Sequence, residues 1–464
     1  MSESRTGPDV AVAMDPENPW VGLASYTEET RASFEGRNEE IAELARRVLR
    51  KSITVLFGQS GLGKTSLLRA GLVPRLRAEA FCPVYLRVDY SPESPPPSEQ
   101  IKQAIFRSAD AGGHWTRPGT AIEGESLWEF LHHRGDLLRD ARGRTLQPLL
   151  IFDQFEEIFT LAQTNATGQL RAREFLEELA DLIENRPPAA LVERLENDEA
   201  AAADFDFAHA GYRILIALRE DYLANLEGMK DIMPSITQNR MRLARMTGAQ
   251  ALTAVVKPGG RLVSQEVAES IVRFVAGGAE LADAEVEPSL LSLICRELNT
   301  VRQAQGHAAI SADLLAGSRD TILSEFYERA LADQPPGVRR MIEDELLTDS
   351  GYRESWAEAR VIKAMAAAGA APDALTRLVD RRLLRIEERL DSRRVELTHD
   401  VLCGVVKASR DVRLERLGAD YPGPRPYDLG DRLSAVPAAS IPAGAAEATR
   451  SRRAPLRWVP HEPV

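Results

Sequence analysis

One short segment, residues 58–65, carries the residue types that bind phosphate. It reads GQSGLGKT and fits the pattern G-x-x-x-x-G-K-[ST] at every fixed position. An apolar run at 53–57 precedes it as a predicted strand, and residues 66–76 follow it with helical periodicity. Its three glycines let the backbone turn several N–H groups toward one phosphate, and the next helix adds its positive N-terminal end. The residues expected to hold the phosphates are Gly58, Gln59, Ser60, Gly61, Leu62, Gly63, Lys64, Thr65 and Ser66.

Side chains on this loop and on a later acidic segment supply the charges for phosphoryl transfer. Lys64 is expected to reach the β- and γ-phosphates, and the Thr65 hydroxyl to complete the ligand shell of a Mg²⁺ ion. A later apolar run ends in Asp153, which would hold the same ion through water. Glu156 or Glu157 would polarise the attacking water, and the sequence leaves open which of the two is the base.

A further candidate, Arg219, stands at the end of another apolar run. The carboxyl ends of parallel strands share one edge of the sheet, so Arg219 would contact the γ-phosphate and report its presence. The alternative is a surface arginine that pairs with Glu220 or Asp221. The chain has no Asn-Lys-x-Asp segment typical of guanine recognition, so ATP is favoured over GTP as the nucleotide.

The composition limits the class of protein. The 464 residues are 44% apolar and 28% charged, which excludes a wholly disordered chain, a collagen-like chain and a disulfide scaffold. Cys82, Cys295 and Cys403 lie far apart without a CxxC or CxxH neighbour, so a zinc site is not expected. The net charge of −12 disfavours broad electrostatic binding to nucleic acid.

Other patterns concern membranes and DNA. No apolar run approaches the ~20 residues that span a bilayer, and the N-terminus lacks the apolar region of a secretory signal. We therefore expect a soluble cytoplasmic protein with no membrane partner. Basic runs at 46–51, 240–245 and 381–394 keep a DNA-associated ATPase, a loader or motor, as an alternative, although each run is more simply a solvated helix face or wing.

The order of elements predicts a layered α/β domain in the first half of the chain, with a mainly parallel sheet between two layers of helices. A helix is expected at 171–185 and an acidic inserted loop at 186–207. His132 and His133 are adjacent on a predicted helix and face different directions, which is a poor start for a metal site. The predicted strands are 53–57, 83–90, 148–153, 212–220 and a short fifth at 240–246.

The second half of the chain is predicted to be mostly helical. Ala, Leu and Glu dominate after residue 247, and helical periodicity continues to about residue 371. Residues 373–416 read helix, helix, strand, turn at Asp391, strand, helix, an order that suits a winged-helix domain. The predicted organisation is a flexible tail at 1–17, a P-loop NTPase domain at 18–247, an all-α helical domain at 248–371, a winged-helix domain at 372–417 and a disordered Pro/Ala/Arg-rich tail at 418–464.

Three segments together carry a family resemblance that covers about residues 18–412. Segment 18–41 (NPWVGLASYTEETRASFEGRNEEI), LLIFDQFEEIF and VELTHDVLCGVV resemble the novel STAND NTPases, signal-transduction ATPases related to the NACHT, NB-ARC and AAA+ groups. In this family an aromatic-x-Gly-Arg-x-x-Glu element lies against adenine, a proline lies over the base, and a histidine of the winged helix senses the diphosphate state. The residues that the resemblance assigns to these roles are Phe34, Gly36, Arg37, Glu40, Pro288 and His399.

The resemblance implies a molecular switch in bacterial signalling or defence. ADP would lock the P-loop domain against the winged helix through His399, and ATP with Mg²⁺ would release it, with slow hydrolysis resetting the state. The expected partners are ATP, further copies of the chain in a conditional homo-oligomer, and another protein for sensing or output, unless the chain is a compact family member. A scaffold that holds ADP without turnover stays open as an alternative.

Overall fold

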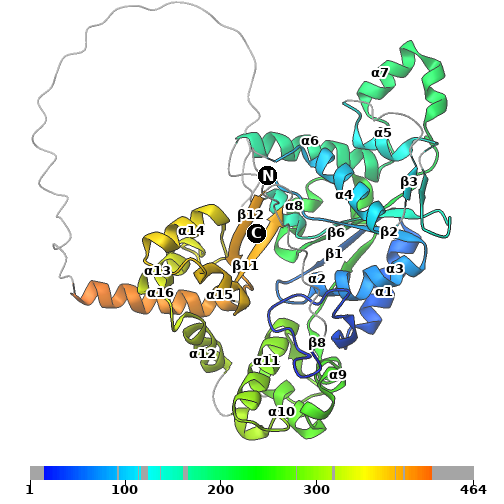
Figure 1. Cartoon of the computed structure of the whole chain (residues 1–464). Coiled ribbons are helices and arrows are strands. Elements are labelled where there is room, and N and C mark those ends of the chain that lie inside the picture. Colours follow the sequence, from blue (N-terminus) through cyan, green and yellow to red (C-terminus); the bar gives the residue numbers. More distant parts are fainter. Residues whose placement is uncertain are drawn as a thin grey trace, which may run out of the picture. The chain divides into compact units, whose positions relative to one another are not determined.

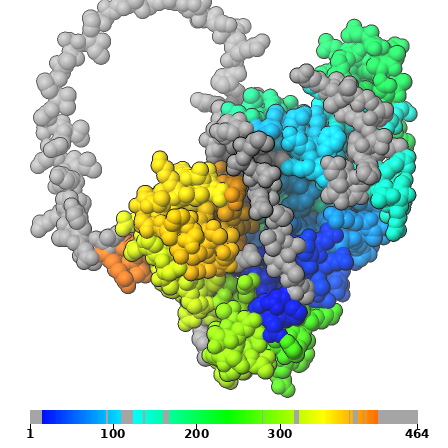
Figure 2. Space-filling model, viewed as in Figure 1, coloured from blue at the N-terminus to red at the C-terminus, as the bar shows by residue number. Residues whose placement is uncertain are grey.

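The computed structural model describes residues 15–420 apart from short gaps at 91–93, 113, 117–123, 136, 160–165, 278, 316–318, 382 and 390–391. The predicted tails at 1–17 and 418–464 lie largely outside the described residues. Glu17 is an exception, because its carboxylate contacts Arg302 at 3.1 Å and its carbonyl accepts a hydrogen bond from Asn299 at 2.6 Å. The assignment of Glu17 to a flexible tail was therefore wrong. Figure 2 shows this N-terminal segment in dark blue against the green helices.

A parallel five-stranded sheet forms the centre of the first half of the chain (Figure 1). Its strand order is β2-β5-β6-β1-β7, so β6 lies between the strand before the phosphate loop and the strand that ends in Asp153. All four strand pairs of this sheet are parallel. The strands are β1 (Ile53–Gly58), β2 (Phe81–Leu86), β5 (Gln147–Phe152), β6 (Arg213–Arg219) and β7 (Arg240–Arg242).

Alternating side chains of these strands build two separate cores, one on each face of the sheet. On β5, Leu149 and Ile151 pack toward one face, whereas Leu150 and Phe152 pack toward the other. The first face is covered by α1 (Asn38–Arg50) and by a continuous helical stretch made of α2 (Lys64–Ser66), a π-helical segment (Leu67–Leu72) and α3 (Val73–Ala78). The second face is covered by α4 (Pro97–Gly112), α5 (Leu127–His132), α6 (Ala166–Ile183) and α8 (Leu223–Glu227). The three layers agree with the predicted α/β class.

One expectation in this region was wrong. The acidic segment 186–207 is not a loop, because it contains α7 (Ala189–Asn197) and a 3₁₀ turn (Glu199–Asp204). Leu191 is 1% exposed and Phe205 is 5% exposed, so two apolar anchors hold the segment against the second face of the sheet. A short antiparallel pair, β3 (His114–Thr116) with β4 (Leu137–Arg139), lies in the same part of the chain.

In the part of the chain that the structure describes, five α-helices lie between the parallel sheet and residue 346. A short antiparallel pair, β8 (Met246–Thr247) with β9 (Glu285–Val286), accompanies them, and β9 lies where the sequence predicted only helices. The helices are α9 (Gly248–Gly259), α10 (Gln265–Val275), α11 (Pro288–Ala304), α12 (Arg319–Leu331) and α13 (Pro336–Glu345).

The last described part of the chain is a small antiparallel sheet with helices. Its strand order is β10-β12-β11, and β10 (Ser355–Ala357) comes from before the predicted boundary at 372. The predicted pair of helices after 373 was therefore wrong: one helix, α15 (Ala374–Asp380), precedes the strands, and the other, α14 (Glu358–Ala367), lies earlier. The remaining elements are β11 (Leu384–Arg389), β12 (Ser392–Leu397) and α16 (Val401–Asp420).

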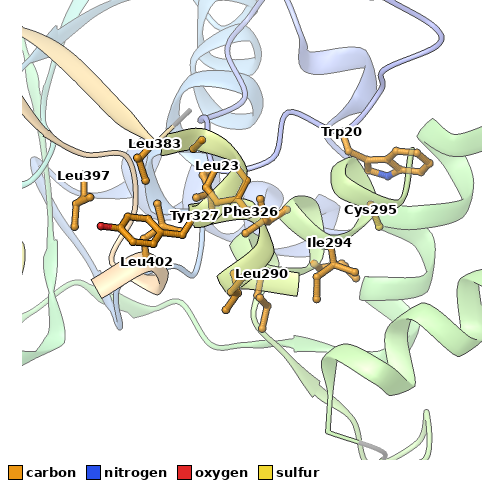
Figure 3. Packing of buried hydrophobic residues seen from close by; sticks show 14 of the residues in the cluster. Trp20, Leu23, Leu290, Ile294, Cys295, Phe326, Tyr327, Leu383, Leu397 and Leu402 are labelled. Atoms are coloured by element: carbon orange, nitrogen blue, oxygen red, sulfur yellow. The ribbon is translucent and has the colours of Figure 1, made fainter. Parts of the chain in front are cut away.

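One contiguous hydrophobic core joins the helices α9–α13 to this small sheet. Leu290 and Ile294 of α11, Tyr327 of α12 and Leu397 of β12 belong to the same cluster, as Figure 3 shows. Trp20 of the N-terminal segment, 2% exposed, also belongs to it. Among the described residues, no helix is both long and apolar enough to cross a bilayer.

Candidate active site

The loop at 58–65 lies at the carboxyl end of β1, where the strand passes into α2. Gly61 and Gly63 have φ values of 83° and 81°, in the left-handed region that glycine adopts without strain. At Gly58 a Cβ atom would lie 2.5 Å from the backbone carbonyl oxygen of Leu243, so the close approach of β7 requires a glycine there. The Lys64 ammonium group donates to the carbonyl oxygens of Gly58 at 2.8 Å and Gln59 at 3.0 Å, and thereby closes the loop into a ring.

Asp153, the residue after β5, lies next to the loop. Its Oδ2 atom accepts a hydrogen bond from the Thr65 hydroxyl at 2.6 Å and another from the Tyr85 hydroxyl. Its Oδ1 atom accepts one from the backbone N–H of Gln154 at 3.0 Å. A hydroxyl and a carboxylate oxygen at this separation are the hard oxygen donors that Mg²⁺ prefers, so the residues present fit the expected ion.

The two glutamates after Asp153 differ in their surroundings. Glu156 lines the cavity beside the loop, and its Oε2 atom accepts a hydrogen bond from the backbone N–H of Arg219 at 3.2 Å. Burial raises the pKa of Glu156 to about 7, although the nearby Lys64 opposes this shift. Glu157 points elsewhere and forms a two-point ion pair with Arg87, in which one contact is 3.1 Å long. The geometry therefore distinguishes two residues that the sequence left equivalent.

Arg219 lies at the cavity and is also paired with an acid. The residue lines the cavity, and its guanidinium also pairs with Asp221 at 2.5 Å. The carboxylate of Asp221 keeps the Arg219 pKa above its ordinary value, although burial opposes this shift. Because β6 lies between β1 and β5, Arg219 emerges between the loop and the acidic segment.

The cavity has a second wall made by residues near the small sheet of the C-terminal part. The Ser60 hydroxyl donates a hydrogen bond to Asp400, and Arg353 lies 3.4 Å from the other oxygen of that carboxylate. His399 lines the cavity as well. Burial, together with the positive charges of Arg353 and Arg385, lowers the His399 pKa to about 4, so its imidazole is neutral at pH 7.

The space between the two walls measures about 150 Å³, whereas a neighbouring cavity at the acidic segment measures about 10 Å³. The lining of the larger cavity includes the apolar residues Leu23, Phe34, Met246 and Leu291 besides the charged ones. A cavity with both charged and apolar residues in its lining suits a ligand that joins phosphates to a flat base.

The structure brings most of the predicted site residues to this cavity. Gly36, Glu40, Gly58, Gln59 and Glu157 do not line it, although the carbonyls of Gly58 and Gln59 bind Lys64. Arg37 is 2% exposed and is held by Glu40 at 2.6 Å and by the Ala244 carbonyl at 2.8 Å. The predicted residues that line the cavity are Phe34, Arg37, Ser60, Gly61, Leu62, Gly63, Lys64, Thr65, Ser66, Asp153, Glu156, Arg219, Pro288 and His399. Their individual roles stay predictions.

Sequence reasoning missed several residues of the walls. Arg353 lies in a turn between α13 and β10 and has no motif around it, so nothing in the sequence signals its place. Arg385 belongs to one of the basic runs, which gives no indication of the cavity, and it pairs with Glu396 at 2.5 Å. Tyr26 could have been predicted from the sequence, because it lies within segment 18–41, which resembles the novel STAND NTPases. Its backbone N–H donates a hydrogen bond to the Ser66 hydroxyl at 3.0 Å.

The fold and the loop define a P-loop nucleoside triphosphatase. The chain belongs to the family Novel STAND NTPase 1, whose model matches residues 19–405. The binding of a nucleotide and the hydrolysis of its terminal phosphate are accordingly the general chemistry of this chain. No curated protein matches the sequence.

Solved structures of P-loop ATPases are similar to the chain only at a low level. Cdc6p from Pyrobaculum aerophilum is 13% identical, with 82% of this chain and 94% of that chain covered and a TM-score of 0.36. The ORC1 protein of Aeropyrum pernix in complex with DNA is 16% identical, with 83% and 94% covered and a TM-score of 0.39. A Walker-type ATPase of Pyrococcus abyssi is 14% identical, with 83% and 99% covered and a TM-score of 0.37. Similarities at this level carry no argument about what the chain acts on.

Proposed function

We propose that the protein is a switch that binds ATP and hydrolyses it slowly. Residues 18–247 are its NTPase domain, and a winged-helix unit is the part that ATP releases from this domain. The observation that carries the proposal is that a residue of the phosphate loop, Ser60, is hydrogen-bonded to Asp400 at the far end of the chain. We place the start of the winged-helix unit near residue 355 rather than 372, because β10 pairs with β12. Residues 248 to about 354 form the helical domain of this proposal.

The charges around the cavity support recognition of a di- or triphosphate. Lys64 and Arg219 face it from the NTPase domain, and Arg353 and Arg385 face it from the other wall. The N–H groups of the loop and the start of α2 add further positive potential. Thr65 and Asp153 would hold Mg²⁺, which neutralises charge on the phosphates when it is bound.

Glu156 is proposed as the base that orients and deprotonates the attacking water. It lines the cavity, and the backbone N–H of Arg219 donates a hydrogen bond to its Oε2 atom, which restrains the carboxylate beside the loop. A pKa near 7 suits a base that works at neutral pH, because the group is partly ionised and still basic. Glu157 is assigned no chemical step, because Arg87 holds its carboxylate in an ion pair.

The proposed switch follows from the negative charge of Asp400. Its carboxylate lies beside the loop, where a third phosphate would bring further negative charge close to it. ADP leaves the contact between Ser60 and Asp400 in place, whereas ATP weakens it by repulsion between like charges. A ligand shifts such an equilibrium only through its different affinities for the two states, so the two nucleotides must bind the docked form with different strength.

The test combines nucleotide content with molecular mass. The full chain is purified, the nucleotide released by denaturation is identified by chromatography, and the native protein is analysed by light scattering with and without ATP and Mg²⁺. Bound ADP on a monomer, and a larger mass only with ATP, is the expected result. A chain that hydrolyses ATP at constant mass would contradict the association step and leave a simple ATPase. Bound ADP without turnover would instead indicate the scaffold alternative.

The DNA-associated alternative is tested in the same preparation. In the described part of the chain, several arginines of the basic runs are already paired with acids: Arg47 with Glu43, Arg240 with Glu227, Arg242 with Glu220, Arg385 with Glu396 and Arg393 with Glu358. These pairs reduce the positive charge left for phosphates of DNA. Retention on duplex DNA at moderate salt, lost as the salt rises, would favour the alternative nonetheless.

A further inference from the structure

Two side chains at the end of β2 reach the acidic segment of the neighbouring strand. Tyr85 lies on β2 and Arg87 follows its last residue, so the two side chains stand two residues apart, on the same side of an extended backbone. In the parallel register Tyr85 is opposite Ile151 of β5, two residues before Asp153. Each of the two side chains contacts a different acid: Tyr85 contacts Asp153, and Arg87 contacts Glu157.

The Tyr85 hydroxyl fixes the orientation of the Asp153 carboxylate. It donates to Oδ2, the atom that also accepts from Thr65, while Oδ1 is held by the backbone of Gln154. With both oxygens held, the carboxylate has one orientation, in which Oδ2 faces the Thr65 hydroxyl. The aromatic ring is itself held in place, because the Arg69 guanidinium lies 5.5 Å from its centroid.

The Arg87 guanidinium holds Glu157 away from the nucleotide. It binds both carboxylate oxygens, and the side chains of the pair are only 9% and 13% exposed. A two-point contact of this kind fixes direction as well as charge. Without the guanidinium of Arg87, the negative charge of Glu157 would be less well compensated, within a few residues of Asp153 and Glu156. Glu396 of β12 lies 3.9 Å from the same guanidinium and shares its charge.

We propose that Tyr85 and Arg87 are positioning residues for the hydrolytic site: Tyr85 aligns Asp153 for the divalent cation, and Arg87 keeps Glu157 out of the reaction so that Glu156 alone faces the nucleotide. The inference rests on the proposed function, in which Asp153 serves the cation and Glu156 is the base. Neither residue touches the nucleotide, so each acts only through the acid that it holds.

The test of Tyr85 separates binding of the metal from binding of the nucleotide. Affinity for a fluorescent ADP is measured in EDTA, and the apparent affinity for Mn²⁺ is then measured by electron paramagnetic resonance at saturating ADP. Y85F is expected to weaken Mn²⁺ by about tenfold, the usual effect of losing a hydrogen bond to a charged acceptor, and to leave ADP in EDTA within about twofold. Y212F is the matched control, because it removes a buried hydroxyl that donates to the Leu182 carbonyl at 2.9 Å, away from the cavity.

A double-mutant cycle with D153N decides how Tyr85 acts. In the D153N background Y85F is expected to cause no further loss of Mn²⁺ affinity. An equal loss in both backgrounds, or an equal loss with and without metal, would show a purely structural role and overturn the inference. If D153N itself leaves Mn²⁺ affinity unchanged, the proposed metal site fails, which is a different outcome from failure of Tyr85 alone.

The test of Arg87 uses rescue by a second substitution. R87M is expected to lower turnover at least about tenfold, because it removes the guanidinium that holds both oxygens of the Glu157 carboxylate. The double variant R87M/E157Q removes that charge and is expected to recover most of the lost turnover. R194M, which breaks the pair of Arg194 with Glu129 on α5, is the control and should leave turnover unchanged. Turnover that stays low in R87M/E157Q, in a protein that binds ADP normally, would overturn the role of Arg87.

Discussion

The two walls of the nucleotide cavity are built in different ways. The wall from the NTPase domain consists of consecutive residues, 60–66, whose backbone curls around the Lys64 side chain. The opposite wall consists of Arg353, Arg385 and residues 398–400, which the three-stranded sheet brings together from separate parts of the chain. The first wall is therefore made by local conformation and the second by long-range pairing.

Two contacts between the walls are single hydrogen bonds. Ser60 donates one to Asp400, and at the N-terminus of α11 the Ser289 N–H lies 3.3 Å from the Gly61 carbonyl. Single hydrogen bonds contribute about 0.5–1.5 kcal/mol each, or 1.5–3 kcal/mol when one partner is charged. The contact between Ser60 and Asp400 is therefore of a size that the binding energy of a ligand can offset.

The largest expected effect concerns the proposed base, Glu156, which lies beside the first wall. E156Q should lower the turnover number by about 10²–10⁴-fold, because the amide cannot accept the proton of the water. E157Q should lower it by less than about tenfold, because Glu157 is held by Arg87 outside the cavity. Steady-state ATPase assays on both variants, with ADP affinity as the control for folding, give the comparison. Equal activity in both variants and the wild type would contradict the assignment of Glu156.

A glycine substitution tests how strictly the first wall depends on local conformation. In G61A the new Cβ would lie 2.5 Å from a Glu287 carboxylate oxygen, and the backbone would keep a φ of 83°. The strain of roughly 1–2 kcal/mol predicts an ADP affinity about 5–30-fold lower, measured by titration with a fluorescent ADP. G143A is the matched control, since Gly143 has a φ of 76° with nothing within 4 Å, so affinity should not change.

A smaller effect is expected from loosening the contact between the walls. S60A removes the hydrogen bond to Asp400 without removing a backbone N–H of the loop. Release of a fluorescent ADP, followed after a chase with unlabelled ADP, should be about threefold to tenfold faster than from the wild type. D400N in the S60A background should add little, because both substitutions remove the same contact. Unchanged release in S60A would show that this contact does not hold the second wall.

The smallest expected effect is the response of the second wall to pH. The folded-state pKa of His399, about 4, is below its ordinary value of 6.5, so His399 becomes protonated at a lower pH in the folded protein than in the unfolded chain. The stability from a neutral His399 is therefore complete above pH 6.5 and is lost as the pH falls from 6.5 toward 4. The melting temperature should fall by a few degrees over this window, and by less in H399N. A fall of equal size in both proteins would assign the effect to other groups.

The first wall could be predicted from the sequence because its signals are local. The glycine spacing, the apolar run before it and the strand that ends in Asp153 all report on neighbours within a few residues, and those elements formed as expected. The unequal surroundings of Glu156 and Glu157 could not be predicted, because Arg87 comes from another strand 70 residues away in the sequence. For the same reason the sequence did not predict β10 or the position of Arg353. β10 is placed by pairing with β12, and Arg353 contacts Asp400.

The N-terminal segment is a short connection that is anchored in both halves of the molecule. Leu23 is embedded in the core that joins α9–α13 to the small sheet, while the backbone of Tyr26 is fixed to Ser66 just after the phosphate loop. Three residues of fully extended chain reach at most about 10–11 Å. Unless the packing of Leu23 or the hydrogen bond to Ser66 is broken, any movement of that core away from the loop is limited along this path to that distance.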